Sequence, residues 1–434
     1  MLLAAAAALA NGLTSHVTIS EHALAYLPEG ELLDILADPA LWPYLRNGTQ
    51  FPDGGYAMGE AYSETSHWEP FQDLYLAWIQ EEFAGDWSSD EARQHIAYLM
   101  GLGSHGMGDQ VFDSLYMQRA YVYDADSDWE NVSMDHATDV ALAAETGGYP
   151  IIDPIIFPDP FIALMAVAGV EVDEEILESG QNLTMVATAA VAAEAASAAH
   201  RADWRETFPW AYDHMLDESV HGCPEWEARV VAEYWQVRWA RLNGESAASE
   251  PLIYSFPQDG GYGHPTDITA VESRVTIVFS RGLVTDLLIP DLFAVHDTDG
   301  NPITLIEPWV FYGSSSHVVH LTPAEDWPAE TDFVVSIAAG VPFIDGTSST
   351  AAASFTFSTK APPQEEAPDC GCASAGRAAV WTAGVAFAFA FRRRRAADPR
   401  GPPGGAAQAT RAGAARRPAT TLTTAAATNN AAEA

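Results

Sequence analysis

Hydrophobic residues recur along the chain with two different periods, and the period changes near residue 250. From about residue 16 to 245 the apolar spacing is helical, most visibly along the alanine-rich stretch 185–199. From residue 251 the pattern changes to short alternating runs separated by turn-forming Asp, Gly, Asn and Pro. These runs predict β-strands at 275–279, 310–312, 318–321, 333–337 and 353–357. The pattern predicts an all-α domain at 11–245 followed by a β-sandwich at 251–360.

Three phrases in the predicted β-sandwich are typical of one kind of module. VTIVFSRGL, HLTPAEDWPAETDFVVSI and FTFST resemble the bacterial immunoglobulin-like (Ig-like) domains attached to secreted and surface proteins. The resemblance implies a spacer or an adhesive unit, and we expect no chemistry there.

The first ten residues have the pattern of a signal peptide. An apolar, alanine-rich run ends in the small-x-small sequence Ala8-Leu9-Ala10, although a basic segment before it is missing. We expect 1–10 to be a signal peptide truncated by a late start codon; the alternative is an alanine-rich first helix. Cleavage after Ala10 would make Asn11 the mature N-terminus.

The other end of the chain also has the elements of a sorting signal. A linker at 361–376 holds Cys-Gly-Cys, and 377–395 combines a short apolar segment with four consecutive arginines. Fourteen apolar residues are short for a bilayer span of about 20. This order resembles the C-terminal sorting signals of myxobacterial surface proteins, which implies secretion and attachment to the outer membrane of a Gram-negative bacterium. The tail 396–434 departs from that pattern and is expected to be disordered.

Acidic residues dominate the body of the chain. The 434 residues carry 60 Asp and Glu against 20 Lys and Arg, a net charge of −40. Residues 377–434 hold nine Arg and two acidic residues, so the residues before them hold 11 basic and 58 acidic ones, a net charge of −47. Such a surface repels phosphate backbones, so we expect no long nucleic acid as a partner. With three cysteines in all, a disulfide framework is excluded.

The strongest candidate for chemistry is GLGSHGMGD in the helical region. His105 and Asp109 are four residues apart, which places them on one face of a helix, as two ligands of one metal ion would be. Gly101, Gly103, Gly106 and Gly108 surround them. Because each glycine costs about 1 kcal/mol relative to alanine in a helix, they predict the close approach of another backbone or an ion.

Two more motifs extend this pair to a set of two histidines and two aspartates. FPDGGY offers Asp53, expected on a glycine-flanked loop, and SETSHW offers His67. Nitrogen and oxygen donors of this kind suit Zn²⁺. His16 stands five residues after Asn11, whose free amine and carbonyl could join His16 and Asp109 in a second site.

The order of these motifs resembles the zinc-dependent phospholipase C superfamily, most of all the N-terminal domain of glycosylphosphatidylinositol-specific phospholipase D. The resemblance is close over about 11–145 and reaches 245 by helical content. It implies an all-α, phospholipase C and nuclease-like fold with a cluster of two to three zinc ions. The ligands that it implies for the first two ions are Asp53, His67, His105 and Asp109, and Asn11, His16 and a bridging Asp109.

The third zinc site is where the sequence departs from that superfamily. Asp113 stands where members have a histidine, and Asp139 matches a later carboxylate ligand. The partner of Asp139 in the usual register is Asp135, with His136 one position off. The resemblance therefore implies a third site from Asp113, His136 or Asp135, and Asp139, with altered selectivity.

The expected function is phosphodiester hydrolysis, and most of all a phospholipase C acting on phospholipid headgroups. Zinc ions would activate a water, with Asp53 as the residue that orients or deprotonates it. Two alternatives stay open: a single-strand nuclease or nucleotidase, and a catalytically silent, metal-stabilised surface or adhesion protein, which the departure at Asp113 favours. The Ile- and Phe-rich segment 149–170 could touch a membrane surface or pack against the core. We expect a monomer.

Overall fold

The computed structural model describes residues 12–124, 132–245, 251–268, 270–306, 309–310 and 316–361. Asn11, the two sorting signals and the tail lie outside them. The chain divides into two compact units, 1–365 and 366–434, and all described residues belong to the first unit.

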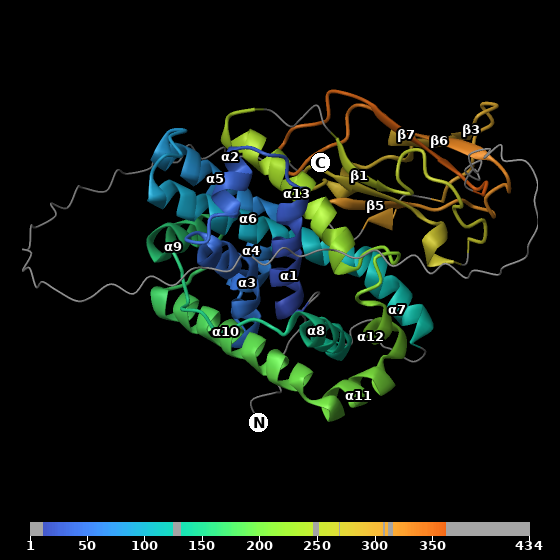
Figure 1. Cartoon of the computed structure of the whole chain (residues 1–434). Coiled ribbons are helices and arrows are strands. Elements are labelled where there is room, and N and C mark those ends of the chain that lie inside the picture. The colour runs from blue at the N-terminus through green and yellow to red at the C-terminus, as the bar shows by residue number, and fades with distance from the viewer. Residues whose placement is uncertain are drawn as a thin grey trace, which may run out of the picture. The chain divides into compact units, whose positions relative to one another are not determined.

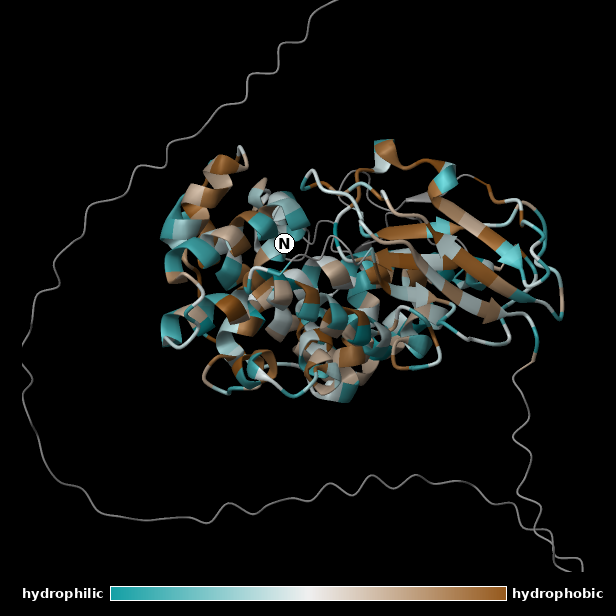
Figure 2. Ribbon diagram, turned by 90° about the horizontal axis from the view of Figure 1, so that it is seen from above, coloured by the Kyte–Doolittle hydropathy of each residue, from teal (hydrophilic) through white to brown (hydrophobic). Residues whose placement is uncertain are grey.

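The region up to Leu242 is helical, as predicted (Figure 1). Its helices are α1 (Leu13–Ala23), α2 (Glu31–Leu36), α3 (Trp42–Met58), α4 (Tyr62–His67), α5 (Glu69–Phe83), α6 (Asp90–Val111), a π-helix (Phe112–Met117), α7 (Gln118–Tyr123), α8 (Val132–Thr146), α9 (Pro158–Val167), α10 (Glu174–Ala196), α11 (Ala198–Thr207), α12 (Pro209–His214) and α13 (Pro224–Leu242). Hydrophilic and hydrophobic stretches alternate along these helices (Figure 2), as amphipathic helices around a common core require.

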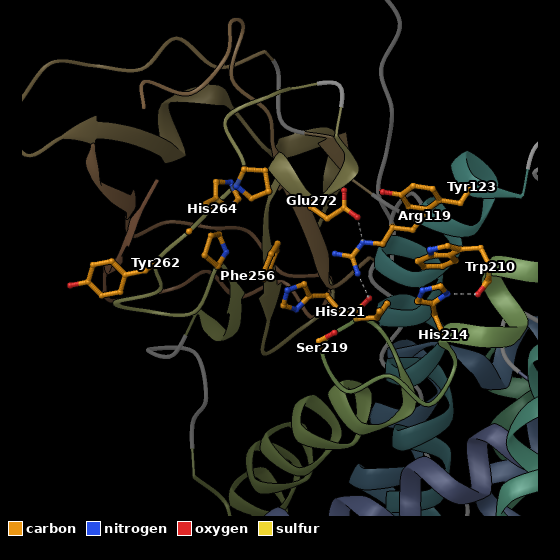
Figure 3. A pocket seen from close by; sticks show the side chains of 14 residues that line it. Arg119, Tyr123, Trp210, His214, Ser219, His221, Phe256, Tyr262, His264 and Glu272 are labelled. Atoms are coloured by element: carbon orange, nitrogen blue, oxygen red, sulfur yellow. Dashed lines mark hydrogen bonds and ion pairs between the residues drawn. The ribbon is translucent and has the colours of Figure 1, made fainter. Parts of the chain in front are cut away.

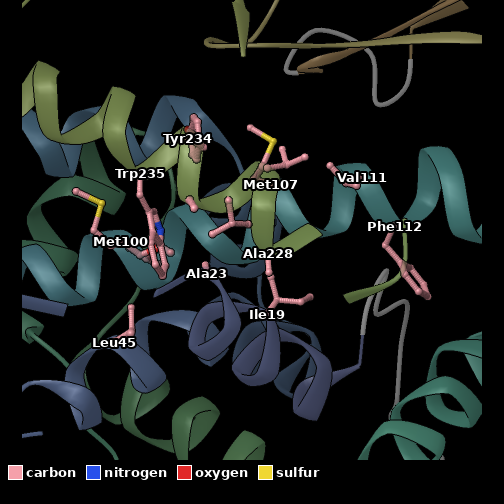
Figure 4. Packing of buried hydrophobic residues seen from close by; sticks show 14 of the residues in the cluster. Ile19, Ala23, Leu45, Met100, Met107, Val111, Phe112, Ala228, Tyr234 and Trp235 are labelled. Carbon is pink, nitrogen blue, oxygen red and sulfur yellow. The ribbon is translucent and has the colours of Figure 1, made fainter. Parts of the chain in front are cut away.

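The helical core is built around α6, which is buried along nearly its whole length. Helix α3 packs along it, and α1, α5 and α13 also contact it. Ile19 of α1, Ala228 of α13 and the large ring of Trp235 are among the side chains that fill the space between these helices (Figure 4). Because the Trp235 indole N–H donates to the carbonyl oxygen of Met100 at 2.7 Å, this buried ring leaves no polar atom unpaired.

Glycines allow the central helices to cross closely. A Cβ atom at Gly101 would lie 2.3 Å from the carbonyl oxygen of Leu45 and 2.7 Å from the amide nitrogen of Thr49. One at Gly106 would lie 2.1 Å from the carbonyl oxygen of His67. Close approach of another backbone, predicted from the glycine cluster, is therefore confirmed at these two positions.

Gly101→Ala is expected to lower the free energy of unfolding by about 1–3 kcal/mol, because the new methyl group meets rigid backbone atoms of α3. Gly103→Ala is the matched control in the same helix. Its methyl group would meet only the Tyr234 ring at 3.3 Å, and the higher helix propensity of alanine offsets that contact. Urea unfolding followed by circular dichroism measures both variants, and equal losses would contradict the helix-crossing explanation.

The region from residue 251 forms two small antiparallel sheets. Their orders are β1-β2-β5-β4 and β3-β6-β7. The strands are β1 (Leu252–Phe256), β2 (Val275–Phe279), β3 (Phe293–Asp297), β4 (Trp309–Val310), β5 (Val318–Leu321), β6 (Asp332–Ile337) and β7 (Ala353–Ser358). Ile277, Val335 and Phe357 belong to one buried cluster that takes side chains from both sheets. The sequence patterns missed β1 and β3.

The apolar segment 149–170 packs mainly against the helical core. Phe161 and Met165 of α9 are fully buried, and the ring of Phe157 stacks on His95 with centroids 3.7 Å apart. Only its edges expose large side chains, at Ile151 and Val167. Of the two alternatives for this segment, the structure therefore favours the buried one. Among the described residues, no helix combines the length and apolar character needed to cross a membrane.

Candidate metal centre

Five predicted ligands from four helices meet inside the helical core. The histidines are His16 on α1, His67 at the end of α4 and His105 on α6, and the carboxylates are Asp53 on α3 and Asp109 on α6. Each side chain is at most 3% exposed. Within the described residues, two groups of three have ligand atoms close enough for one ion each: His16, His105 and Asp109, and Asp53, His67 and His105.

Asp109 lies between all three histidines. Its Oδ1 is 3.2 Å from His16 Nε2, whereas its Oδ2 is 3.3 Å from His105 Nε2 and 3.6 Å from His67 Nε2. Since one carboxylate oxygen faces His16 and the other faces His105 and His67, this side chain has the geometry of a bridge between two neighbouring sites.

Asp53 completes the centre from α3. Its Oδ1 is 3.7 Å from His105 Nε2 and 3.8 Å from His67 Nε2, and its Oδ2 is 4.0 Å from His16 Nε2. The prediction that Asp53 lies on a loop was wrong, because α3 continues through it to Met58. Its glycine neighbours serve packing instead: a Cβ at Gly54 would lie 2.8 Å from the backbone of Gly180, and one at Gly55 would lie 2.5 Å from Ser63.

Backbone carbonyls fix how two of the histidines face the centre. Nδ1 of His67 is 2.7 Å from the carbonyl oxygen of Ser63, and Nδ1 of His105 is 2.7 Å from that of Thr49. A carbonyl only accepts, so each Nδ1 carries the proton and each Nε2 presents a lone pair. This second contact is the usual support of a histidine that binds a metal.

The inward-facing atoms lack partners of the right charge. The two Nε2 atoms of His67 and His105 are 2.9 Å apart, although both carry lone pairs. Both carboxylate oxygens of Asp53, Oδ2 of Asp109 and Nδ1 of His16 are buried without a hydrogen-bond partner. Buried acceptors crowded in this way require a cation among them, so the residues fit a metal site.

Burial and neighbouring charges shift the pKa values of the centre in different directions. Burial lowers the pKa of His67 and of His105, which keeps their imidazoles neutral. For His16 the effect of burial is outweighed by Asp109 and Asp53, and its pKa is raised. Burial, with Asp109 nearby, raises the pKa of Asp53 well above its usual range.

Two residues predicted for the third site, His136 and Asp139, interact with other groups. Nε2 of His136 is 2.9 Å from Glu194, so its ring is directed toward α10. The carboxylate of Asp139 accepts from the N–H groups of Thr14 and Ser15 at 3.1 and 2.7 Å, which stabilises the first turn of α1.

Asp113 and Asp135 are closer to the expectation for a third site. Asp135 is buried and Asp113 is half-buried, and burial followed by a neighbouring aspartate raises the pKa of each carboxyl well above its usual range. The charge of Asp113 is the largest electrostatic contribution to the raised pKa of Asp135, and the charge of Asp109 raises the pKa of both carboxyls. Oδ1 of Asp135 has no hydrogen-bond partner. Of the two alternatives in the α8 register, Asp135 interacts electrostatically with Asp113, whereas His136 pairs with Glu194.

Two aromatic rings adjoin the centre. The ring of Tyr56 lies 5.0 Å from that of His67, and the ring of Trp68 lies 5.5 Å from it. Both are partly exposed, and both donate to Glu64, at 2.6 and 2.7 Å. These rings therefore connect the buried histidine to the surface.

A separate cavity of about 420 Å³ lies where α7 and α12 meet the β region (Figure 3). None of the predicted metal ligands lines it. Its wall includes Arg119, whose Nε is 2.9 Å from Glu272 Oε1, and the rings of Tyr123 and Trp210, which stack with centroids 5.1 Å apart. The cavity is distinct from the metal centre.

Comparison with known proteins supports a distant relationship to a phospholipase. A stretch of 121 residues is 29% identical to the phosphatidylinositol-glycan-specific phospholipase D of Rattus norvegicus. The stretch covers 26% of this chain and 14% of the rat protein, so the chain spans much less than two thirds of that relative. No protein-family model matches the chain.

The solved structures that match the chain differ from it too much to indicate its fold. The match to the bacterial S-layer protein SbsC covers 77% of this chain and 46% of SbsC at 7% sequence identity, with a TM-score of 0.22. The match to the structure of the N-terminal part of SbsC covers 67% of this chain and 78% of that structure at 11% sequence identity, with a TM-score of 0.20. Scores this low do not establish a shared fold.

Proposed function

We propose that the chain is a zinc-dependent phosphodiester hydrolase of the phospholipase C type. The observation that carries the proposal is the buried centre of three histidines and two aspartates, whose acceptor atoms face one another without partners. The partial similarity to a phospholipase D and the motif order described above support it. Zinc is the ion that we assign, because neutral imidazoles with carboxylates are its usual ligands.

The chain's own residues divide the work. His67, His105 and Asp53 would hold one ion, and His16 with Asp109 the next; His105 is close enough to serve either group, and Asp109 lies within 3.6 Å of all three histidines. Bound zinc supplies Lewis acidity toward a phosphoryl group and lowers the pKa of a nearby water. Asp53 would orient that water and accept its proton, since both of its carboxylate oxygens lack hydrogen-bond donors.

Charge and the neighbouring rings favour a lipid headgroup as substrate. The net charge of −47 before residue 377 repels long nucleic acids but tolerates a zwitterionic headgroup. Tyr56 and Trp68 offer partly exposed aromatic faces beside His67, which suit a quaternary ammonium group. We further propose a secreted or surface-attached monomer that contacts membranes, with the two sheets forming an Ig-like sandwich that acts as a spacer or an adhesive unit.

Metal removal tests the activity directly. Hydrolysis of bis(p-nitrophenyl) phosphate is expected to fall on the order of 10³-fold after treatment with a chelator, and to return when zinc is added. Elemental analysis should find about two to three zinc ions per chain. Phosphatidylcholine, phosphatidylinositol and single-stranded DNA, assayed in parallel, rank the substrate classes. Activity that persists without metal would contradict the proposal.

A catalytically silent surface protein is the second candidate. The observation that favours it is the third site, where Asp113 replaces a histidine and His136 is directed toward Glu194. This candidate predicts bound zinc without hydrolysis of any of the three substrates, so the same assays separate the two functions.

A further inference from the structure

The β region contacts the helical region next to candidate metal ligands. Glu69 on α5 follows His67 by two residues, and Gln110 on α6 directly follows Asp109. Both side chains interact with His317, which immediately precedes β5. His317 therefore contacts both α5, which follows His67 in the chain, and α6, which carries Asp109.

Glu69 is the centre of a buried ionic network across this contact. Its Oε2 is 3.3 Å from His317 Nε2 and accepts from the backbone N–H of Gly282 in the β region. Its Oε1 accepts from Arg241 at 2.9 Å and lies 3.8 Å from Arg238, both on α13. A buried carboxylate with donors on both sides holds these elements together, because loss of any donor leaves charge uncompensated.

The network continues to the backbone of His67. Arg238 donates to the side-chain oxygen of Gln72 at 2.7 Å. The amide group of Gln72 donates in turn to the carbonyl oxygens of His67 at 2.8 Å and of Leu102 at 3.2 Å. The position of His67 relative to α6 therefore depends on groups that Glu69 and His317 keep in place.

His317 makes the second connection through its own backbone. Its N–H donates to the side-chain oxygen of Gln110 at 2.5 Å, one residue beyond Asp109. Its Nδ1 lies 3.0 Å from the carbonyl oxygen of Phe279 in β2, which orients the ring toward Glu69. Farther along the same run of helix, the ion pair of Arg119 with Glu272 joins α7 to the β region (Figure 3).

We propose that the β region braces the metal centre, with His317 as the positioning residue that keeps His67 and Asp109 in register. The β region is then part of the metal-binding unit and more than a spacer. The inference rests on the proposed function only in that the centre binds zinc. Its readout is metal affinity, so it can fail while the hydrolase assignment stands.

The test compares zinc affinity in variants of the full chain. His317→Ala removes the contact with Glu69 and is expected to raise the zinc dissociation constant about 10- to 100-fold, as the loss of a supporting group at a metal site does. Competition with a chromophoric chelator measures this constant. The visible absorption of the cobalt-substituted protein should change as well, because the ligand geometry changes. His317→Gln keeps a donor near Glu69 and is expected to recover most of the affinity.

His320→Ala is the matched control. His320 lies on β5, is equally buried, and its Nδ1 is 2.9 Å from Thr276 Oγ1 within the β region. Its loss should lower the melting temperature without changing zinc affinity or the cobalt spectrum. If His317→Ala does not fold, Gln110→Met removes the side-chain amide that accepts from the His317 N–H and is expected to raise the dissociation constant about 3- to 10-fold.

Three outcomes decide the inference. Weaker zinc binding by the His317 or Gln110 variant with an unchanged His320 control supports the brace. Equal affinity in all variants overturns the brace and leaves the hydrolase proposal intact. A wild-type chain that binds no zinc overturns both.

Discussion

Asp109→Ala is expected to abolish zinc binding and to reduce phosphodiester hydrolysis on the order of 10⁴-fold. Asp109 is the only carboxylate among the five candidate ligands within 3.6 Å of all three histidines. Because it lies next to histidines of both groups, its removal weakens both groups at once, whereas His16 and His67 each belong to a single group. Elemental analysis should show zinc falling from two to three ions to less than about one per chain.

Asp124→Asn is the matched control for that variant. Asp124 is also buried, but its carboxylate accepts from the N–H groups of Trp210 and Ala211 at the start of α12. Its replacement should cost stability, about 1–3 kcal/mol because one buried N–H loses its acceptor, and leave zinc content and hydrolysis close to the wild type. Full zinc content in Asp109→Ala, or equal losses in both variants, would contradict a specific role of Asp109 in the metal centre.

One pair of ligands in the centre could be anticipated from the sequence because the two residues are close in the chain. His105 and Asp109 are one helical turn apart, and the glycines before and between them indicated close packing in advance. In FPDGGY the glycines gave the wrong local structure for Asp53. A glycine pair in a loop and one at a helix crossing look the same in sequence, and here Gly180 of α10 and Ser63 of α4 decide between them.

For the third site, the sequence does not determine whether Asp135 or His136 faces the centre. Asp135 and His136 are neighbours on α8, and a helix turns by about 100° between them, so only one can face the centre. Glu194 of α10 lies 2.9 Å from His136 and decides which. The Thr49 carbonyl that orients His105, and the contact of His317 with Glu69, have no sequence signal, because they arise from tertiary packing.

The missed strands have a related cause. β1 and β3 are five residues long, and neither has a clean alternation of buried and exposed positions. The polar His296 and Asp297 end β3, which hides its hydrophobic half. Strands of this kind are stabilised by their partners in the sheet more than by their own composition.

His95 is expected to make the protein less stable in acid. It lies on α6, ten residues before His105, but it contacts Tyr75 through a 2.6 Å hydrogen bond and stacks on Phe157. Burial lowers the pKa of His95 to about 4, below the value of about 6.5 in an unfolded chain. Between these values the unfolded state binds one more proton than the folded state, so the free energy of unfolding falls as pH falls. One histidine shifted this far contributes about 3 kcal/mol of stability at neutral pH that is lost near pH 4.

Comparison with His95→Gln isolates this contribution, because all other titrating groups cancel. The difference in unfolding free energy between wild type and His95→Gln is expected to shrink by about 3 kcal/mol from pH 7 to pH 4. Urea unfolding of the metal-free wild type and His95→Gln at several pH values measures the two curves. If the difference for His95→Gln is independent of pH, the histidine is protonated alike in both states, and its burial does not keep it neutral.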